Sequence, residues 1–387
     1  MIWISLLLIL LPPLADFGYL RRHRGHAGVR RWLAALLAAA DLLPAAGVIL
    51  FRFAHDNTTC IVQASMWLFF IYLLLTLPRM AYYFVRLFGD SRAVRAIAAA
   101  AALLLAGVLI HGAASGRRAL IVRHVVLHSD RLPEAFDGLR VVQFSDLHIG
   151  ALVDPAGEID ALIDSINALR PDLVVFCGDL VNIRYTELDS SVMRRLSRLR
   201  STYGTYSVTG NHDTGHYVRD SLTLPPAVNL AALIERQQAM GWHVLDNRTV
   251  YLRRGDDSIA LSGISYDPAL VLQRHDRSLP GYDLGDTYRG VPPALYDITI
   301  AHIPQLWERI LAEGYGDLTL SGHVHSMQFK VRLFGREFSP ARLLYPRWSG
   351  LYETQGRMLY VNDGIGYVGF PMRIGAAPEI TLFELRR

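Results

Sequence analysis

The sequence predicts an α/β domain with two packed β-sheets, preceded by four membrane-spanning helices. The first 115 residues contain four long apolar stretches that are separated by short polar connectors. From about Ala119 onward, apolar segments of strand length alternate with segments in which apolar residues recur at helical spacing. Because many strands occur with few long helices, two sheets packed face to face are expected.

The four apolar stretches are each near the roughly 20 residues that cross a bilayer core. They cover Ile2–Tyr19, Leu33–Phe53, Ile61–Phe84 and Ala93–Ala113. Any one could be a buried core helix, and the first could be a signal peptide. A signal peptide begins with positive charge, whereas this chain begins Met-Ile-Trp-Ile. Four stretches in succession therefore favour a transmembrane region over residues 1–115.

The connectors predict the orientation of these spans. The first connector, RRHRGHAGVRR, has five arginines; the second, AHDNTTC, has neither Lys nor Arg; and the third carries Arg86, Arg92 and Arg95. The positive-inside bias places the first and third connectors in the cytoplasm. We therefore expect a multi-pass protein of the inner (cytoplasmic) membrane whose second domain lies on the extracytoplasmic side. Arg117 and Arg118, directly after the fourth span, argue weakly for the opposite orientation.

Net charge and cysteine content indicate which binding partners and which cysteine sites to expect. The formal net charge of +4 largely reflects the arginine-rich connectors, so a lipid bilayer is expected as a partner and nucleic acid is not. Cys60 and Cys177 lie far apart, which predicts neither a disulfide framework nor a cysteine metal site. Asp41 lies inside the second span, where an acid indicates either a functional site or a hydrogen-bonded contact between helices.

The second domain reads as strands alternating with amphipathic helices. One helix is predicted where apolar residues recur between Ile159 and Leu169, before Pro171 stops it. A second is predicted at NLAALIERQQAMGW. Strands are predicted, in order, at LRVVQFSDLH, PDLVVFCGDLV, TYSVTGNHD, HVLD, TVYL, IALSGISYD, YDITIAHIP, GDLTLSGHVH, MLYVNDG and EITLFEL.

Five polar clusters share one placement, because each follows an apolar strand. They are Asp146-Leu-His148, Gly178-Asp179, Gly210-Asn211-His212-Asp213, Ala301-His302 and Gly322-His323-Val-His325. Active sites of α/β sheets gather at the carboxyl ends of strands, so the clusters are expected to converge. Their carboxylate, amide and imidazole groups suit Mn, Fe or Zn ions. A single Asp-x-His or His-x-His could be an ordinary surface pair, but five in order favour a metal site.

This ordered set resembles the signature of the calcineurin-like metallophosphoesterases. Their D-x-H, G-D, G-N-H-D/E, lone His and G-H-x-H motifs stand here as DLH, GD, GNHD, AH and GHVH. The resemblance extends from about Leu139 to the C-terminus, and the tail YVNDGIG…PMRIGAAPEITLFEL is similar to the membrane-associated bacterial branch. It implies that residues 119–387 form a metallophosphoesterase domain, a four-layer αββα sandwich holding two metals.

The resemblance also implies a role for each polar residue. Asp146, His148 and His325 would hold the first divalent metal, Asn211, His302 and His323 the second, and Asp179 would bridge them. Two metals about 4 Å apart clamp a phosphoryl group and activate a bridging hydroxide for in-line attack. His212 would face the substrate and either stabilise developing charge or protonate the leaving oxygen. Asp213 is expected to orient the loop. The implied activity is phosphoester hydrolysis, with a phosphodiester favoured over a monoester and the substrate either lipid-linked or soluble.

Two departures from the family pattern affect these expectations. Asn182 stands where related phosphatases often have an Asp that supports the catalytic histidine. An amide cannot stabilise an imidazolium as a carboxylate does, so His212 is less supported or another acid supports it. Ser326-Met327 follows GHVH where this branch often has Gly-Gly, which changes the rim of the pocket.

Alternative functions remain open at the level of sequence. A membrane sensor or scaffold on the same fold would have lost activity, and its mark would be a missing ligand; every matched ligand is present. Transport through the spans is a further alternative, but the spans contain few polar groups.

The segment FKVRLFGREFSPARLLYPRWSGLY, after the last cluster, mixes arginines with aromatic residues. It is either a solvated β-hairpin whose aromatics pack on the domain or an interfacial segment that contacts lipid headgroups.

Overall fold

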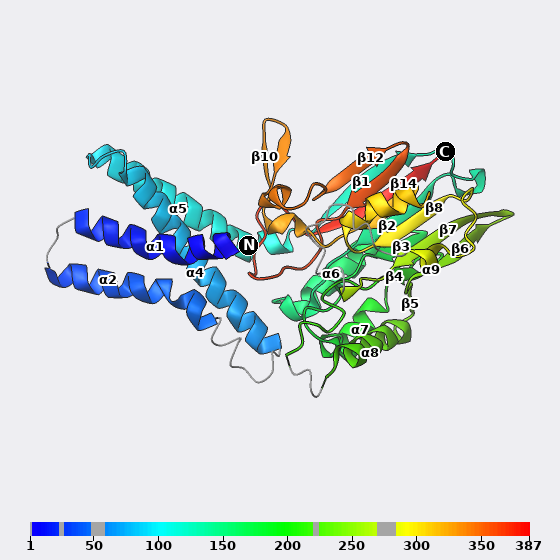
Figure 1. Cartoon of the computed structure of the whole chain (residues 1–387), viewed down its shortest axis with the longest axis horizontal. Coiled ribbons are helices and arrows are strands. Elements are labelled where there is room, and N and C mark those ends of the chain that lie inside the picture. Colours follow the sequence, from blue (N-terminus) through cyan, green and yellow to red (C-terminus); the bar gives the residue numbers. More distant parts are fainter. Residues whose placement is uncertain (1, 23–26, 48–58, 220–223, 269–283) are drawn as a thin grey trace. The chain divides into compact units, whose positions relative to one another are not determined.

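The computed structural model describes residues 2–22, 27–47, 59–219, 224–268 and 284–387. The chain divides into two compact units. One comprises Met1–Ser115 with Gly369–Met372, and the other comprises Gly116–Val368 with Arg373–Arg387. We call the first the helical unit and the second, which contains the predicted phosphoesterase domain, the catalytic unit. Figure 1 colours their elements along the chain.

The helical unit contains α1 (Ile2–Arg22), α2 (Ala27–Asp41), α4 (Thr59–Arg86) and α5 (Arg92–Ala114). Among the described helices, two are long and apolar enough to cross a membrane: Thr59–Arg86, with 28 residues and mean hydropathy 2.0, and Arg92–Arg118, with 27 residues and mean hydropathy 2.3. The first predicted span coincides with α1, whereas the second runs beyond α2 into residues outside the described part. The bundle of four spans therefore stays a prediction.

Charged side chains inside the helical unit pair with one another. Arg79 on α4 donates to the carboxylate of Asp41 at the end of α2. Its Nε also lies 3.4 Å from the carboxylate of Asp16 on α1. Asp41 was interpreted either as a functional site or as a hydrogen-bonded contact between helices. The ion pair with Arg79 supports the contact between helices.

The first sheet of the catalytic unit has the strand order β1-β14-β2-β3-β4-β5. Its strands are β1 (Ile121–His128), β2 (Leu139–Phe144), β3 (Leu173–Phe176), β4 (Thr205–Ser207), β5 (Trp242–Val244) and β14 (Glu379–Arg386). Strands β2 to β5 run parallel, and β14 is antiparallel to β2. The carboxyl ends of β2, β3 and β4 consequently meet at one edge.

The second sheet has the order β12-β13-β9-β8-β7-β6. It contains β6 (Arg248–Arg254), β7 (Asp257–Ile264), β8 (Asp297–Ala301), β9 (Leu318–Ser321), β12 (Gly350–Thr354) and β13 (Arg357–Val361). Strands β7, β8, β9 and β13 are parallel, with β6 and β12 antiparallel at the edges. Parallel pairing again brings the carboxyl ends of β8 and β9 together.

The two sheets form an α/β sandwich, as predicted. Its core is one apolar cluster drawn from both sheets, including Val141 of β2, Val175 of β3, Ile300 of β8 and Leu320 of β9. The helices are α6 (Pro155–Ala168), α7 (Ser190–Leu196), α8 (Pro226–Ala239), α9 (Gly285–Tyr288) and α10 (Trp307–Ala312). Helices α6 and α8 match the predicted helices, whereas α7, β1 and β12 were not anticipated.

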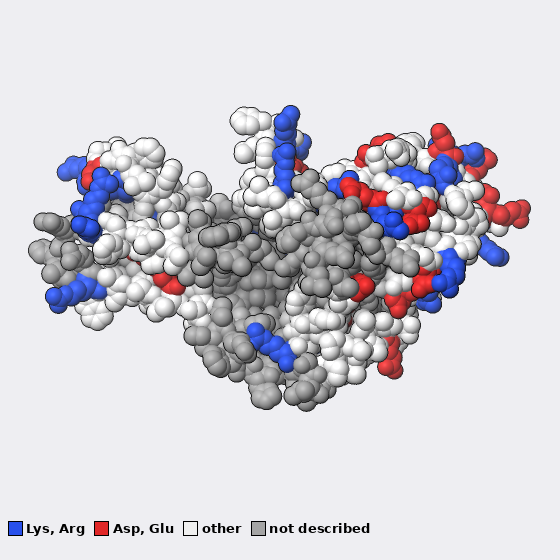
Figure 2. Space-filling model, in the orientation of Figure 1, with Lys and Arg blue, Asp and Glu red and all other residues white. Residues whose placement is uncertain are grey.

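A two-stranded sheet stands apart from the sandwich. Strands β10 (Val331–Leu333) and β11 (Arg336–Phe338) form an antiparallel hairpin that projects from the catalytic unit (Figures 1 and 2). The hairpin expected in this segment is therefore present. The aromatic residues of the segment FKVRLFGREFSPARLLYPRWSGLY differ in exposure: Phe334 at the hairpin tip is fully exposed, whereas Trp348, outside the hairpin, is 9% exposed and belongs to an apolar core cluster.

Candidate metal centre

The five polar clusters lie on loops that follow β2, β3, β4, β8 and β9. Within them the structure brings histidine and aspartate side chains into three groups that could hold a metal ion. The groups are Asp146-His148-His325, His148-Asp179-His212 and Asp179-His302-His323, and the ligand atoms of each lie within 4.8 Å of one another. Residues spread over the whole catalytic unit are thus gathered at one place.

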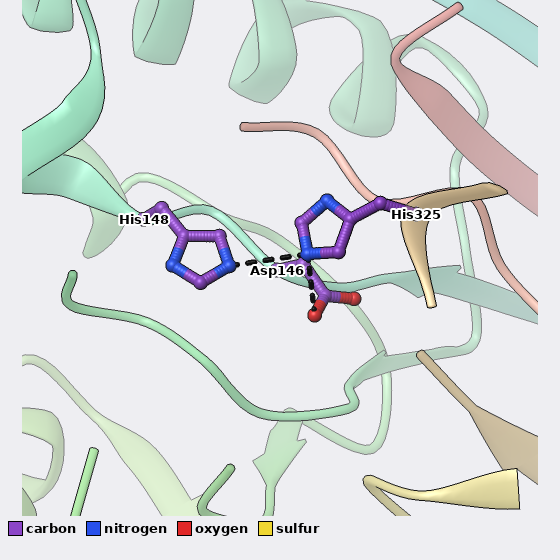
Figure 3. Close-up of side chains that lie close together, drawn as sticks. All are labelled: Asp146, His148 and His325. Atoms are coloured by element: carbon purple, nitrogen blue, oxygen red, sulfur yellow. Dashed lines mark hydrogen bonds and ion pairs between the residues drawn. The ribbon is translucent and has the colours of Figure 1, made fainter. Parts of the chain in front are cut away.

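The first group is shown in Figure 3. The Nε2 atom of His325 lies 3.1 Å from Nε2 of His148 and 3.1 Å from Oδ1 of Asp146. All three residues are buried. Two ring nitrogens and a carboxylate oxygen that point at one spot are the donor set of a cation site.

The third group, Asp179-His302-His323, is extended by an amide, and the group His148-Asp179-His212 lies between it and the first through the shared residues His148 and Asp179. The Oδ1 atom of Asn211 lies 3.1 Å from Nε2 of His302 and 2.9 Å from Nδ1 of His323. The amide nitrogen of Asn211 donates to the hydroxyl of Tyr217, at 3.2 Å, which fixes the oxygen toward the histidines. The amide therefore presents an acceptor, as a metal ligand must.

Asp179 joins the two groups. Its Oδ2 lies 3.3 Å from Nε2 of His302 and 3.6 Å from Nε2 of His148. Its Oδ1 accepts the backbone N–H of His212 at 2.8 Å. One carboxylate thus reaches both predicted metal positions and also fixes the start of the His212 loop.

Two histidine rings are oriented by hydrogen bonds from Nδ1 to backbone carbonyls. Nδ1 of His302 donates to the carbonyl of Cys177 at 2.8 Å, so its Nε2 faces Asn211. Nδ1 of His212 donates to the carbonyl of Asn182 at 2.6 Å, which leaves its Nε2 available for substrate. Metal-binding histidines are usually oriented by such second hydrogen bonds.

The electrostatics of the centre favour a bound cation. Burial alone would raise the pKa of Asp146, but neighbouring His325 lowers it well below the usual range. Burial also opposes ionisation of Asp179, and the charge of His302 lowers its pKa well below the usual range. For His302, burial would lower the pKa, but the Asp179 carboxylate raises it to about 9. Both acids are therefore anions at neutral pH and attract positive charge.

The backbone of the centre is held in uncommon conformations. Five of the seven predicted ligands have positive φ angles, namely Asp146, His148, Asp179, His323 and His325. Such angles cost free energy for residues other than glycine, and they cluster at functional sites. Two glycines permit close approach: a Cβ on Gly210 would lie 2.1 Å from Asp179 Oδ1, and one on Gly322 would lie 2.3 Å from Asp146 Oδ2.

Two buried carboxylates position the loops without facing the centre. Asp213 accepts the backbone N–H groups of Asp179, Leu180, Val181 and Gly210, so it orients the loop as expected. Burial, followed by the charge of Asp179, raises the pKa of Asp213 to about 7.

Glu187 is the second such carboxylate, and it was not predicted. It accepts the N–H groups of Gly150, Asn182, Ile183 and Arg184, at 2.9, 2.5, 2.8 and 3.3 Å. It therefore holds the backbone whose carbonyl binds His212. Among the described residues, no donor reaches the side-chain oxygen of Asn182. The histidine is thus supported by the backbone of residue 182, which a Glu187 carboxylate fixes in place.

The donor set fits two divalent ions. Oxygen and imidazole donors converge in two adjacent groups, the two carboxylates are ionised, and the His302 ring is oriented by a backbone carbonyl so that its Nε2 faces Asn211. An α/β sandwich with such a centre at the carboxyl ends of its strands is the arrangement of a metal-binding α/β protein.

Comparison with known proteins identifies the family. A family model for calcineurin-like phosphoesterase matches residues 139–327. The chain is 30% identical to the uncharacterised metallophosphoesterase YkuE of Bacillus subtilis, over 73% of this chain and 93% of that protein. The chain therefore belongs to the calcineurin-like metallophosphoesterases, which confirms the resemblance drawn from the motifs.

Other relatives are membrane proteins by name or act on lipid. The chain is 31% identical to "Transmembrane protein with metallophosphoesterase domain" of Danio rerio, over 74% of this chain and 62% of that one. It thus spans less than two thirds of that relative. It is 26% identical to the UDP-2,3-diacylglucosamine pyrophosphatase LpxG of Chlamydia muridarum, over 66% of this chain and 86% of that protein.

Proposed function

We propose that this chain is a membrane-anchored, dinuclear metal phosphoesterase whose catalytic unit lies on the extracytoplasmic side of the cytoplasmic membrane. The observation that carries the proposal is that Asp179 belongs to two of the three metal-binding groups. A carboxylate shared between two adjacent donor sets is the arrangement of a dinuclear site.

The ligand assignment follows the two groups. Asp146, His148 and His325 would hold one ion, and Asn211, His302 and His323 the other, with Asp179 contributing to both. The mixture of oxygen and imidazole donors suits Mn, Fe or Zn. When bound, such ions polarise a phosphoryl oxygen and activate water.

The protein's own residues supply orientation and a proton. His212 is half-buried, and its Nδ1 is committed to the carbonyl of Asn182. A proton on its Nε2 is therefore the one that can pass to a leaving oxygen. His323 is the predicted ligand that is not fully buried, so substrate approaches from the side of His212 and His323.

We further propose that the substrate is a phosphodiester or pyrophosphate carried on a lipid. Two features support this: two helices are apolar enough to cross a membrane, and one relative is named for hydrolysis of a lipid-linked pyrophosphate. A sensor or scaffold without activity would not need a complete set of converging donors. The arrangement of all seven ligands favours an enzyme.

The proposal is tested with the full chain in lipid nanodiscs. The metal-to-protein ratio is measured after purification, and hydrolysis is measured on a soluble phosphodiester, a phosphomonoester and a nucleotide-linked lipid with Mn, Fe or Zn added.

We expect two metals per chain and fastest hydrolysis of the lipid-linked substrate. Asp179→Ala should lose nearly all metal and turnover, while Asp256→Ala, at an exposed turn, should retain both. Full metal content and turnover in Asp179→Ala would overturn the site assignment.

A further inference from the structure

The hairpin of β10 and β11 exposes apolar side chains to an unusual extent. All eight residues from Val331 to Phe338 are exposed. The exposed fraction is 53% for Leu333, 38% for Phe338 and 102% for Phe334 at the tip. A two-stranded hairpin is marginal in water unless something packs on it, so a contact that covers this one is expected.

The pairing register gives the hairpin two different faces. Val331 pairs with Phe338 and Leu333 with Arg336, so these side chains share one face. Arg332 pairs with Glu337 on the other face. One face and the tip are therefore apolar with an arginine beside them, and the opposite face is charged.

The tip places a large ring where the backbone disfavours it. Phe334 and Gly335 form the two-residue turn and have φ angles of 50° and 77°. A turn with two positive φ angles favours Asn-Gly, and a bulky residue at its first position is an outlier. The chain thus accepts local strain and an exposed aromatic ring together. Neither helps folding, which points to a role in contact.

The base of the hairpin is tied to the metal centre. Ser339, directly after β11, donates its hydroxyl to the carbonyl of Ser326 at 2.6 Å, next to His325. Lys330, directly before β10, donates to the carboxylate of Asp363. That carboxylate also accepts the hydroxyl of Ser326 at 2.5 Å. The hairpin and the centre are therefore parts of one hydrogen-bonded assembly.

We propose that the hairpin docks on a lipid bilayer, with Phe334 and Leu333 among the acyl chains and Arg336 and Arg332 at the phosphates. Aromatic rings favour the headgroup level, and arginine binds phosphate as a planar fork. The same chain carries two helices that are long and apolar enough to cross a bilayer, which makes a bilayer the partner that fits this apolar tip. This bilayer contact does not depend on the proposed function. The further inference that the contact steers lipid-borne substrate toward the metal centre does rest on the proposed function.

The contact is tested without any measurement of activity. A spin label is placed at Phe334→Cys in the full chain carrying Cys60→Ser, because Cys60 is exposed whereas Cys177 is buried. The chain is reconstituted in vesicles of phosphatidylcholine and phosphatidylglycerol. Collisions with oxygen, which concentrates in the bilayer, are compared with those of a water-soluble nickel chelate.

We expect oxygen to dominate at position 334 and nickel to dominate at Tyr251→Cys, an exposed aromatic position on β6. Nickel dominance at both positions overturns the proposal. So does dipolar coupling between labels at position 334, which would show that a second copy of the chain covers the tip.

The link to catalysis has its own test. Phe334→Asn suits the turn better than phenylalanine, so a loss of function cannot come from misfolding. We expect it to lower kcat/KM on a bilayer-borne phosphodiester about tenfold, the scale of one lost aromatic burial. A soluble phosphodiester should be hydrolysed as before, and the matched Tyr251→Ser variant should keep both activities.

Equal losses of kcat/KM on the bilayer-borne and the soluble substrate would contradict the inference that the hairpin steers lipid-borne substrate toward the metal centre. Absence of all hydrolysis together with an oxygen-accessible tip would contradict the proposed function while leaving the bilayer contact established.

Discussion

At the scale of single residues, His212 is the side chain that we propose as the proton donor. Its Nδ1 is held by the carbonyl of Asn182, and its ring stacks on Tyr217 with centroids 4.5 Å apart. We expect His212→Ala to lower turnover by about 10² or more, the usual effect of losing a general acid, with metal content unchanged.

The leaving group distinguishes the possible roles of this histidine. If Nε2 protonates the leaving oxygen, a substrate with a nitrophenolate leaving group should be much less affected than one with an alcohol. Equal losses for good and poor leaving groups would instead show that His212 only stabilises charge.

Glu187 should act through the same histidine. Glu187→Gln replaces one acceptor oxygen by an NH2 group, which cannot accept a backbone N–H, so part of the anchor of the loop at Asn182 is lost. We expect kcat to fall about tenfold with KM nearly unchanged, since a displaced histidine weakens proton transfer.

A double-mutant cycle separates this positioning role from general destabilisation. In the His212→Ala background, Glu187→Gln should cost no further turnover, because its effect passes through the missing ring. An additive loss in the double variant would show that Glu187 acts elsewhere.

These residues also show what the sequence could predict. The convergence of these histidine and aspartate side chains was predictable because such residues directly after apolar strands are unusual and occur in a fixed order. Their roles as metal ligands and proton donor stay predictions. Glu187 was not, since an acid in YTELD has no pattern; its role arises only when four N–H groups of a loop turn toward it. The support of His212 by a backbone carbonyl was equally invisible, because residue type does not determine main-chain contacts.

At the scale of elements, buried strands were predicted better than exposed ones. β3 and β8 are continuous apolar runs that are buried along their whole length. β1 and β12 lie at sheet edges and keep exposed positions, so their sequences mix polar and apolar residues and were missed. For the aromatic residues around Trp348, packing on the domain and contact with lipid were both predicted as alternatives; Trp348 packs on the domain, with the Nζ of Lys330 5.5 Å from its ring centroid.

The helices of the helical unit allow a prediction about packing. Arg79→Met would leave the carboxylates of Asp16 and Asp41 without their shared counter-ion. We expect the unfolding free energy of the solubilised full chain to fall by about 1–3 kcal/mol, judging from broken buried ion pairs and from membrane hydrogen bonds. Thermal loss of the helical circular dichroism signal measures this change.

Matched variants define the cause of that loss. Arg92→Met, at an exposed position at the start of α5, should leave the transition unchanged. Adding Asp41→Asn to Arg79→Met should restore part of the stability, because it removes one unpaired charge. No difference between Arg79→Met and Arg92→Met would mean that the ion pair does not hold the helices.

At the scale of the whole molecule, the distribution of arginines among the connectors predicts on which side of the membrane the catalytic unit lies. The connector between the first two predicted spans has five arginines, and AHDNTTC between the second and third has none. The structure describes the helices but fixes no bilayer, so orientation rests on charge alone. If these arginine-rich connectors are cytoplasmic, as we propose, the catalytic unit lies outside the cytoplasm.

Reporter fusions at the C-terminus check this orientation. Alkaline phosphatase, which is active only outside the cytoplasm, should be active after Arg387, and green fluorescent protein at the same position should stay dark. Exchanging Asn57 and Thr58 for lysine adds positive charge to the outer connector and should lower phosphatase activity per fusion protein, because the bias that sets orientation is reduced. Lysine at Asp256 within the catalytic unit should change nothing, since long domains are translocated largely regardless of their charge. The opposite result, a fluorescent green fluorescent protein fusion and an inactive alkaline phosphatase fusion, would place the metal centre in the cytoplasm. The positive charges of Arg117 and Arg118 would then have outweighed those of the connectors, and the lipid-borne substrate would have to be sought on the inner leaflet.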